Sequence, residues 1–257
     1  MRDALHAEWT KLRTTSGPAL LIVAAVALTV AVSAAVAAGV SYTAGTSQDL
    51  AKISLTGIYL GQAVIAIFAV LAVSAEYSTG MIRTTLTAMP RRSTLLAAKA
   101  IVITTLVLAA GSLAVLACVL AGRLLLQGNG FTPAHGYRVL SLAEASTLRA
   151  AGGSVLYLVL IALLSLGIAL ALRDSATAIG VVLALLYLFP IVAAAVSNIH
   201  WWRHLQQIGP MTAGLAIQTT TGVDRLPIGP WAGLGVLACW ATGAMLIGAL
   251  SLQLRDA

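Results

Sequence analysis

Between two long apolar runs the sequence reads Glu76-Tyr77-Ser78-Thr79-Gly80-Met81-Ile82-Arg83 and continues to Pro90-Arg91-Arg92. The residues on both sides are almost wholly apolar, which is typical of helices embedded in lipid. A charged stretch between two such helices has to lie in water. It therefore predicts a surface loop that meets something outside the membrane.

The pattern inside this loop predicts a short helix. Ile82, Leu86 and Met89 recur at the spacing of one helix face, so the helix has an apolar stripe. Gly80 permits a turn before it, and Pro90 ends it. This pattern favours a helix that docks on a partner.

The charges of the loop have two interpretations. Glu76 stands where the second apolar run ends, and Arg83, Arg91 and Arg92 are displayed beyond it. Basic residues are also typical of any loop on the inner side of a membrane. From the charges alone, a loop that only sets topology remains an alternative.

Composition excludes a soluble domain. Hydrophobic residues make up 60% of the 257 residues and charged residues 9%, whereas soluble domains have roughly 25% charged residues. The mean hydropathy is +0.97. The net charge of +7 does not indicate nucleic-acid binding, because the basic residues flank apolar runs instead of clustering on a soluble domain. The bilayer is the expected solvent.

Six stretches approach the roughly 20 apolar residues that cross a hydrocarbon core. They are residues 18–40, 57–75, 95–121, 154–172, 176–196 and 231–252. None has a charge at its centre, and Lys99 lies near enough to the start of the third to extend to the membrane surface. The sequence predicts an all-α polytopic membrane protein with one transmembrane domain over residues 1–257.

Two connections have local signals of their own. Residues 173–175 form a tight turn between the fourth and fifth stretches, and Asp174 or Ser175 is placed to cap the next helix. Residues 197–230 form an outer loop with tryptophans typical of a membrane interface, and a helix within it is interrupted at Gly209-Pro210.

Lysine and arginine counts predict the orientation. With the N-terminus inside, the inner segments hold nine basic residues and the longer outer segments hold six. The higher density marks the cytoplasmic side. Both termini and the coupling loop, residues 76–94, are therefore expected in the cytoplasm.

Residues 1–16 predict an amphipathic helix that lies flat at the inner leaflet. Leu5, Trp9 and Leu12 stand at i, i+4 and i+7, which gives an apolar stripe. The other faces carry Arg2, Asp3, Glu8, Lys11 and Arg13. A merely solvated basic start is the alternative.

Other site types find little support. Cys118 and Cys239 lie inside apolar runs and are expected to be packing residues. His200 and His204 stand one helical turn apart but lack a third metal ligand nearby. Gly45-Thr46-Ser47 has no histidine placed to activate the serine. No GxxxxGK[ST] occurs, so we expect no nucleotide site in this chain. On the grounds above we also expect no catalytic residues and no metal site.

The motif Glu76-x-x-x-Gly80-x-x-Arg83, followed by Pro90-x-Arg92, resembles the segment after the second span in type-2 ABC transporter permeases. Residues 8–13 are similar to the start of many actinobacterial members. One departure is Met81, where many relatives have threonine. The resemblance implies six spans, an interfacial N-terminal helix, a cytoplasmic coupling helix between the second and third spans, and exporters built from two membrane subunits and two ATPase subunits.

The resemblance also implies roles and partners. The chain would be the permease of a bacterial inner-membrane exporter, itself not an enzyme, working as a homodimer with two copies of an ATPase that binds ATP and Mg²⁺. The coupling residues would be Glu76, Gly80, Arg83, Pro90, Arg91 and Arg92. The residues of the interfacial helix would be Leu5, Trp9, Lys11, Leu12 and Arg13.

The apolar spans indicate how energy enters. Charge at a span's centre costs roughly 2.5–3.5 kcal/mol, and ion-coupled carriers keep such groups for their chemistry. Since these spans have none, we expect movement to be driven through the loop helix, with a hydrophobic or amphiphilic cargo. Alternatives are an ATPase-independent channel or secondary carrier, for which Gln62 and a few hydroxyls are available, and a membrane-bound enzyme or scaffold, for which no catalytic set is found.

Overall fold

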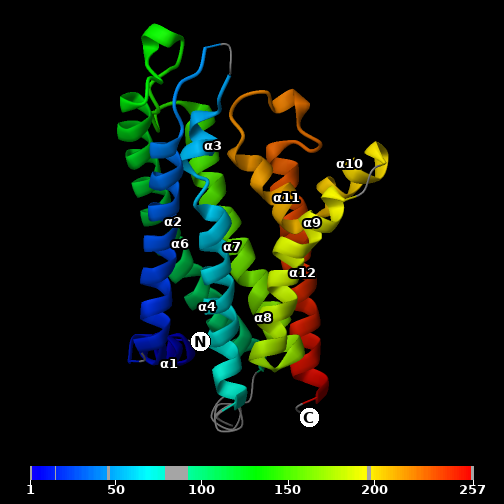
Figure 1. Ribbon diagram of the computed structural model, residues 1–257. Coiled ribbons are helices and arrows are strands. Elements are labelled where there is room, and N and C mark those ends of the chain that lie inside the picture. The colour runs from blue at the N-terminus through cyan, green and yellow to red at the C-terminus, as the bar shows by residue number, and fades with distance from the viewer. Residues whose placement is uncertain (1, 15, 45–46, 79–91, 196–197, 256–257) are drawn as a thin grey trace.

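The computed structural model describes residues 2–14, 16–44, 47–78, 92–195 and 198–255. In these ranges the regular structure is helical, and no strand occurs. Figure 1 shows the long helices running side by side along one direction. The expected all-α membrane architecture is confirmed at this level.

Five helices of the described ranges are long and apolar enough to cross a membrane. They are α2 (Ser16–Gly39), α6 (Arg92–Gly128), α7 (Ala145–Leu172), the run of α8 (Ser175–Leu183), η2 (Ala184–Leu188) and α9 (Phe189–Ala194), and α12 (Pro230–Arg255). The segment η2 is a single π-helical turn inside that run.

The expected second span corresponds to α4 (Ile58–Ser78). Its described apolar part, Ile58–Ser74, is shorter than the five helices above, so a count of six spans is not confirmed. Two other helices exceed the apolar stretches that predicted them. α6 continues to Gly128 and α7 begins at Ala145, because a helix does not have to end where the hydrocarbon core ends.

The bundle has two distinct ends. The termini end holds α1 (Arg2–Thr14), the last turn of α4, the first turn of α6 and the turn between α7 and α8 (Figure 1). The loop end holds the short elements, which are α3 (Leu50–Ser54), η1 (Pro133–His135), α10 (Ile199–Ile208), α11 (Pro210–Leu215), η3 (Ala216–Gln218) and η4 (Val223–Arg225). Gly209 separates α10 from α11, as the sequence predicts.

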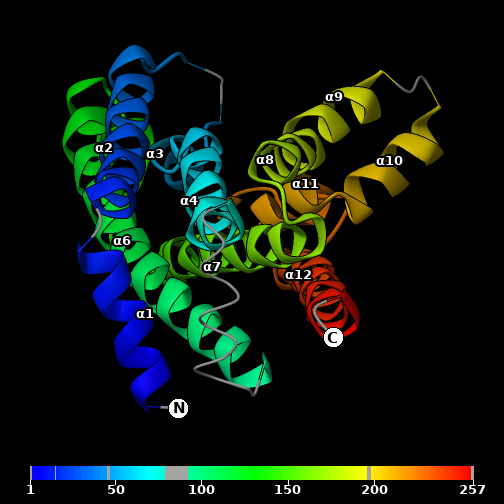
Figure 2. The same ribbon diagram turned by 90° about the horizontal axis from the view of Figure 1, so that it is seen from below.

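Helix α7 lies at the centre, between α4 and α6 on one side and α8 and α12 on the other (Figure 2). Its backbone lies close against that of α12 at Gly167, where an added Cβ would be 2.4 Å from the carbonyl carbon of Ala244. Small residues allow backbones to meet in this way where lipid provides no hydrophobic drive. The core of the bundle is therefore built around α7.

The turn between α7 and α8 is closed by local contacts. Arg173 adopts φ 62°, and the Asp174 side chain accepts a hydrogen bond from the Thr177 amide at 2.7 Å, so the expected cap is present. The Arg173 guanidinium donates to the backbone oxygen of Ser251 at 2.9 Å. These contacts join the turn to the end of α12.

Candidate functional site

The predicted coupling loop lies mostly outside the described residues. Gly80, Arg83, Pro90 and Arg91 fall there, together with the helix expected over 81–89. Glu76 belongs to the last turn of α4, and Arg92 is the first residue of α6, but the side chains of both are also outside the described part. The coupling helix thus stays a prediction.

Helix α1 lies flat across the termini end, beside the first turns of α6 (Figures 1 and 2). The two are joined by an ion pair between Glu8 of α1 and Lys99 of α6. The Lys99 Nζ donates to both carboxylate oxygens, at 2.9 and 3.0 Å. The side chains are only 8% and 3% exposed. The pair is therefore withdrawn from water.

This pair corrects two expectations. Lys99 was expected to extend to the membrane surface, and Glu8 to lie on a face of α1 other than its apolar stripe. Instead, Lys99 lies two turns inside α6, with α1 packed over it. Residues 5, 8 and 12 share one helix face just as 5, 9 and 12 do, so the buried face of α1 is turned toward Glu8. The bundle thus contains a buried ion pair near the start of α6.

The stability of this ion pair depends on both charges and on their geometry. Removing two charges from water is costly, and their attraction offsets the cost only when both are present and well oriented. Helix α1 is therefore held to α6 by a contact that fails if either partner is lost. A displacement of one helix should carry the other with it.

The other residues predicted for the interfacial helix lie on either side of this pair. Leu12 is buried, Leu5 and Lys11 are half-buried, and Trp9 is 44% exposed. The side chain of Arg13 lies outside the described part. Trp9 and Leu12 also line a small apolar cavity of about 280 Å³ shared with α2, α4 and α6. This arrangement suits a helix with one face on protein and one in the membrane interface.

The loop end is joined by hydrogen bonds of a different kind. Asp49 caps α3 by accepting from the Lys52 amide at 3.1 Å. The same carboxylate accepts from the Thr220 amide at 2.6 Å, the Thr220 hydroxyl at 2.7 Å and the Thr221 amide at 3.0 Å. One side chain thus joins α3 to the segment before α12.

A buried polar cluster lies between α4 and α7. The Tyr157 hydroxyl donates to Gln62 Oε1, and Gln62 Nε2 donates to the Tyr59 carbonyl at 3.1 Å. The hydroxyl of Tyr187, in the π-helical turn η2, also donates to the Tyr59 carbonyl. The cluster links the α8 run to α4 and α7 without any charge.

The described residues contain no candidate metal site and no paired cysteines. No group of three histidine, cysteine or acidic side chains there is placed to hold a metal ion. His200 and His204 are exposed on α10, Cys118 is buried and Cys239 is exposed.

Comparison with known families decides what these helices belong to. Residues 4–191 match the family described as ABC-2 family transporter protein. The chain belongs to this family. It is thus an ABC-2 type permease, a membrane-spanning transport subunit of an ABC transporter. No curated protein matches the chain.

The matched range of the ABC-2 permease includes the buried pair of α1 and α6 and the connection 79–91. It ends within α9, before α10, α11 and α12. Sequence reasoning recognised the family but missed the partners Glu8 and Lys99. A signal was available, because an acid and a base close to lipid at the same end of the bundle gain most by pairing.

Proposed function

We propose that this ABC-2 permease is the membrane subunit of an ATP-driven exporter in a bacterial inner membrane. It would work as a homodimer with two copies of a separate ATPase, which binds ATP and Mg²⁺. Its cargo would be hydrophobic or amphiphilic, because the described spans offer lipid-like surface and few buried polar groups. In this proposal α4 also crosses the membrane, as the second of six spans along the chain, and both termini lie in the cytoplasm.

The observation that carries the proposal is the pairing of α1 with α6 at the termini end. Lys99 lies two helical turns after the connection 79–91, in which the coupling residues are predicted. A push on that connection would reach α6 first and α1 next, through the pair Glu8–Lys99. The ATPase would contact Arg83, Arg91 and Arg92 and shift α6 and α1 as one body.

The orientation rests on charge. With the termini end inside, nine basic residues fall in inner segments and six in outer segments. This asymmetry is the one that sets topology during insertion. A cysteine introduced at Ser41, which is exposed at the loop end, should react with an impermeant maleimide added outside intact cells.

The experiment for the proposed function uses the whole complex. The tagged permease is purified from its own membranes in mild detergent together with any bound P-loop ATPase. It is then reconstituted in vesicles with a fluorescent lipophilic dye as the cargo probe. Dye movement that requires ATP, and hydrolysis that depends on the permease, are the expected results. The triple variant Arg83→Ala, Arg91→Ala and Arg92→Ala should lose both.

The same contact between α1 and α6 also supports the alternative of a secondary carrier. The pair Glu8–Lys99 is buried and ionisable, as proton-coupled transport requires. The same vesicles containing the permease alone, under an imposed pH gradient and without nucleotide, separate the two. Uphill dye movement there would replace the exporter with the carrier.

A further inference from the structure

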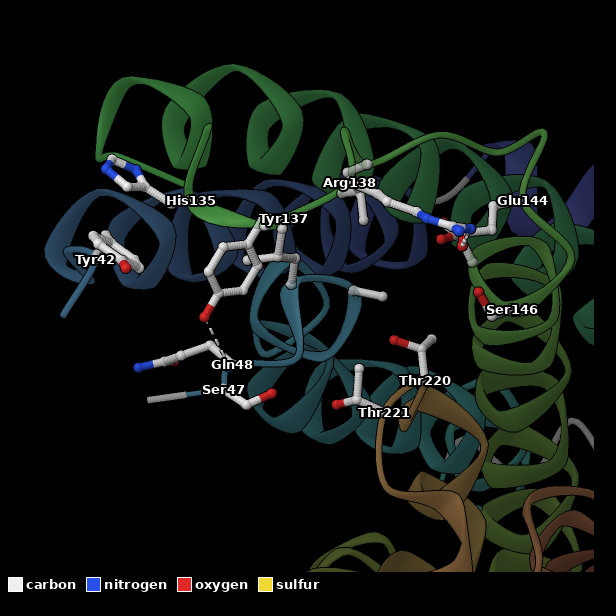
Figure 3. Close-up of a pocket in the computed structure, with 15 residues that line it drawn as sticks. Tyr42, Ser47, Gln48, His135, Tyr137, Arg138, Glu144, Ser146, Thr220 and Thr221 are labelled. Atoms are coloured by element: carbon white, nitrogen blue, oxygen red, sulfur yellow. Dashed lines mark hydrogen bonds and ion pairs between the residues drawn. The ribbon is translucent and has the colours of Figure 1, made fainter. Parts of the chain in front are cut away.

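A cavity of about 580 Å³ opens at the loop end, at the opposite end of the bundle from the ion pair of α1 and α6 (Figures 1 and 3). It is lined by Tyr42 and by residues from three segments, 47–51, 135–147 and 220–221. Its volume falls within the roughly 300–1,000 Å³ of small-molecule sites. Neither the coupling proposal nor the family match assigns it a role.

Hydrogen bonds join the segments that form the walls of the cavity. Asp49 fastens Thr220 and Thr221 to α3 through the three hydrogen bonds given above. On the opposite side, the backbone amide of Gln48 donates to the Tyr137 hydroxyl at 3.2 Å. A site held in this way spends little binding energy on ordering its own loops.

One side of the cavity is aromatic. The rings of Tyr42 and His135 are stacked, with centroids 4.2 Å apart and an interplanar angle of 16°. His135 Nδ1 lies 2.7 Å from the Gly130 carbonyl oxygen, which holds the imidazole in place. Tyr137 stands edge-on to Tyr42, with centroids 6.1 Å apart. The result is a rigid aromatic surface at the rim.

The rest of the lining is rich in hydroxyl and amide groups, which both donate and accept hydrogen bonds. Figure 3 shows Ser47, Gln48, Ser146, Thr220 and Thr221 around the same space. A ligand that itself has many hydroxyl groups would form hydrogen bonds with most of these side chains.

The charges of the lining cancel each other. Arg138 and Glu144 form an ion pair at 3.5 Å across the cavity rim. The lining thus has no excess of either charge that would attract an ion in preference to an uncharged molecule. The lining therefore favours a neutral ligand.

We propose that the cavity binds a neutral glycosyl group. A sugar ring has an apolar C–H face, which would lie on an outer face of the stacked pair Tyr42 and His135. Its hydroxyl edge would face Thr221, and a second sugar unit would reach Ser146, which lies at the opposite end of the cavity from Tyr42 and His135 (Figure 3). The same chemistry is offered by a free oligosaccharide and by the headgroup of a glycolipid.

The test uses the whole permease in nanodiscs, since neither end is known to fold alone. Maltose is the soluble probe, and binding is followed by saturation-transfer NMR. Glycerol, which has hydroxyls but no ring, and glycylglycine, which is zwitterionic, are the comparison solutes. A second arm measures the affinity of the permease for vesicles of phosphatidylcholine with and without monoglucosyl diacylglycerol.

Saturable binding of maltose, with little signal from glycerol or glycylglycine, is the expected result for a free sugar. Preference for vesicles with the glucolipid and no maltose binding would assign the site to a headgroup. In either case Tyr42→Leu and Thr221→Val should each weaken binding by about five- to tenfold, the effect of one lost contact. Ser146→Ala should weaken maltose binding as well, whereas Ser41→Ala, an exposed serine outside the lining, should not.

Thermal unfolding of each variant shows whether it has folded. Thr221→Val keeps the backbone amide bonded to Asp49, so its melting temperature should equal that of the parent protein. Absence of glycosyl binding in both arms, equal signals from all three solutes, or unchanged affinity in folded Tyr42→Leu and Thr221→Val would overturn the proposal. None of these results depends on the ATPase.

Discussion

At the termini end, α1 is fastened to α6 by two opposite charges buried from water, whereas at the loop end one half-buried carboxylate collects hydrogen bonds from backbone amides and a hydroxyl. The first contact joins two helices that each have other neighbours. The second joins the start of the short helix α3 to the segment before α12. Both cross long distances in sequence, but they should respond differently to change.

A buried ion pair is strongly cooperative, because the loss of one charge leaves the other without compensation. A carboxylate that accepts several hydrogen bonds near water can lose one and be solvated instead. The termini end should therefore move as a unit or not at all. The loop end should act as a frame that tolerates local adjustment.

The largest expected effect comes from removing half of the buried pair. Lys99→Ala leaves Glu8 charged and buried, so we expect a loss of about 3–5 kcal/mol of unfolding free energy. The measurement is thermal unfolding of the purified protein in detergent, followed by circular dichroism. Glu8→Ala should cost a similar amount for the converse reason.

A double variant separates structure from coupling. Replacing both charges by apolar residues of similar size, Glu8→Leu with Lys99→Met, should restore most of the stability. If the pair also transmits movement from the ATPase, ATP-dependent dye transport in this variant should stay well below that of the parent protein. A variant that regains both would reduce the pair to a structural contact.

The next largest effect tests the packing between the two ends. In Gly167→Ala the new Cβ would lie 2.4–2.6 Å from backbone atoms of α12, which cannot rotate away. We expect a cost near the upper part of the roughly 1–3 kcal/mol range of overpacking. Gly153→Ala, nearer the loop end, meets the side chain of Ile217 instead and should cost less.

Gly152→Ala is the matched control on the same helix. Outside its own stretch of helix, no atom of the described residues lies within 4 Å of the methyl group that this change adds. Alanine is also a better helix former than glycine. The variant should unfold at the same temperature as the parent protein or slightly above. Equal losses in all three variants would show that α7 does not approach α12 as closely as described.

A smaller effect is expected at the loop end. Asp49→Ala removes the cap of α3 and the acceptor for Thr220 and Thr221, at an expected cost of about 1.5–2 kcal/mol, because water can replace part of what is lost. Asp49→Asn keeps one acceptor oxygen and should fall between. Thermal unfolding of the three proteins in one detergent gives the ranking, and a loss as large as that of Lys99→Ala would erase the contrast between the ends.

Much of this fold was predictable because lipid simplifies the sequence code. A helix in hydrocarbon needs about 20 apolar residues, and such runs are visible without any tertiary information. The positions of α2 and α12, the cap at Asp174 and the break at Gly209 follow from signals of this local kind.

The site was harder to predict from the sequence because its contacts join residues far apart in the chain. Glu8 and Lys99 are separated by 91 positions, and Asp49 and Thr220 by 171. Helix α1 presents Leu5 and Leu12 on a face that either Trp9 or Glu8 can complete, and only the packing against α6 decides for Glu8. Periodicity identifies the apolar face of a helix to within about one residue. Here Trp9, expected at the membrane interface, and Glu8, which forms the ion pair, are adjacent residues.

The smallest effect is expected at Asp174, in the water-exposed turn of the termini end. The hydrogen bond from the Thr177 backbone amide lowers the pKa of this carboxyl below its ordinary value of 3.8. A carboxyl with a lowered pKa stabilises the folded state fully above the unfolded value, and that contribution is lost as the pH falls through the folded pKa. Asp174→Ala should therefore melt slightly below the parent protein at pH 7, and the gap should narrow as the pH is lowered below 4. Asp174→Asn keeps an acceptor for the amide without the charge. The gap between the melting temperatures of Asp174→Asn and Asp174→Ala should therefore not change with pH. A gap between parent and Asp174→Ala that stays constant down to acidic pH would mean that the cap acts through its shape alone and that charge matters at this end only in the buried pair.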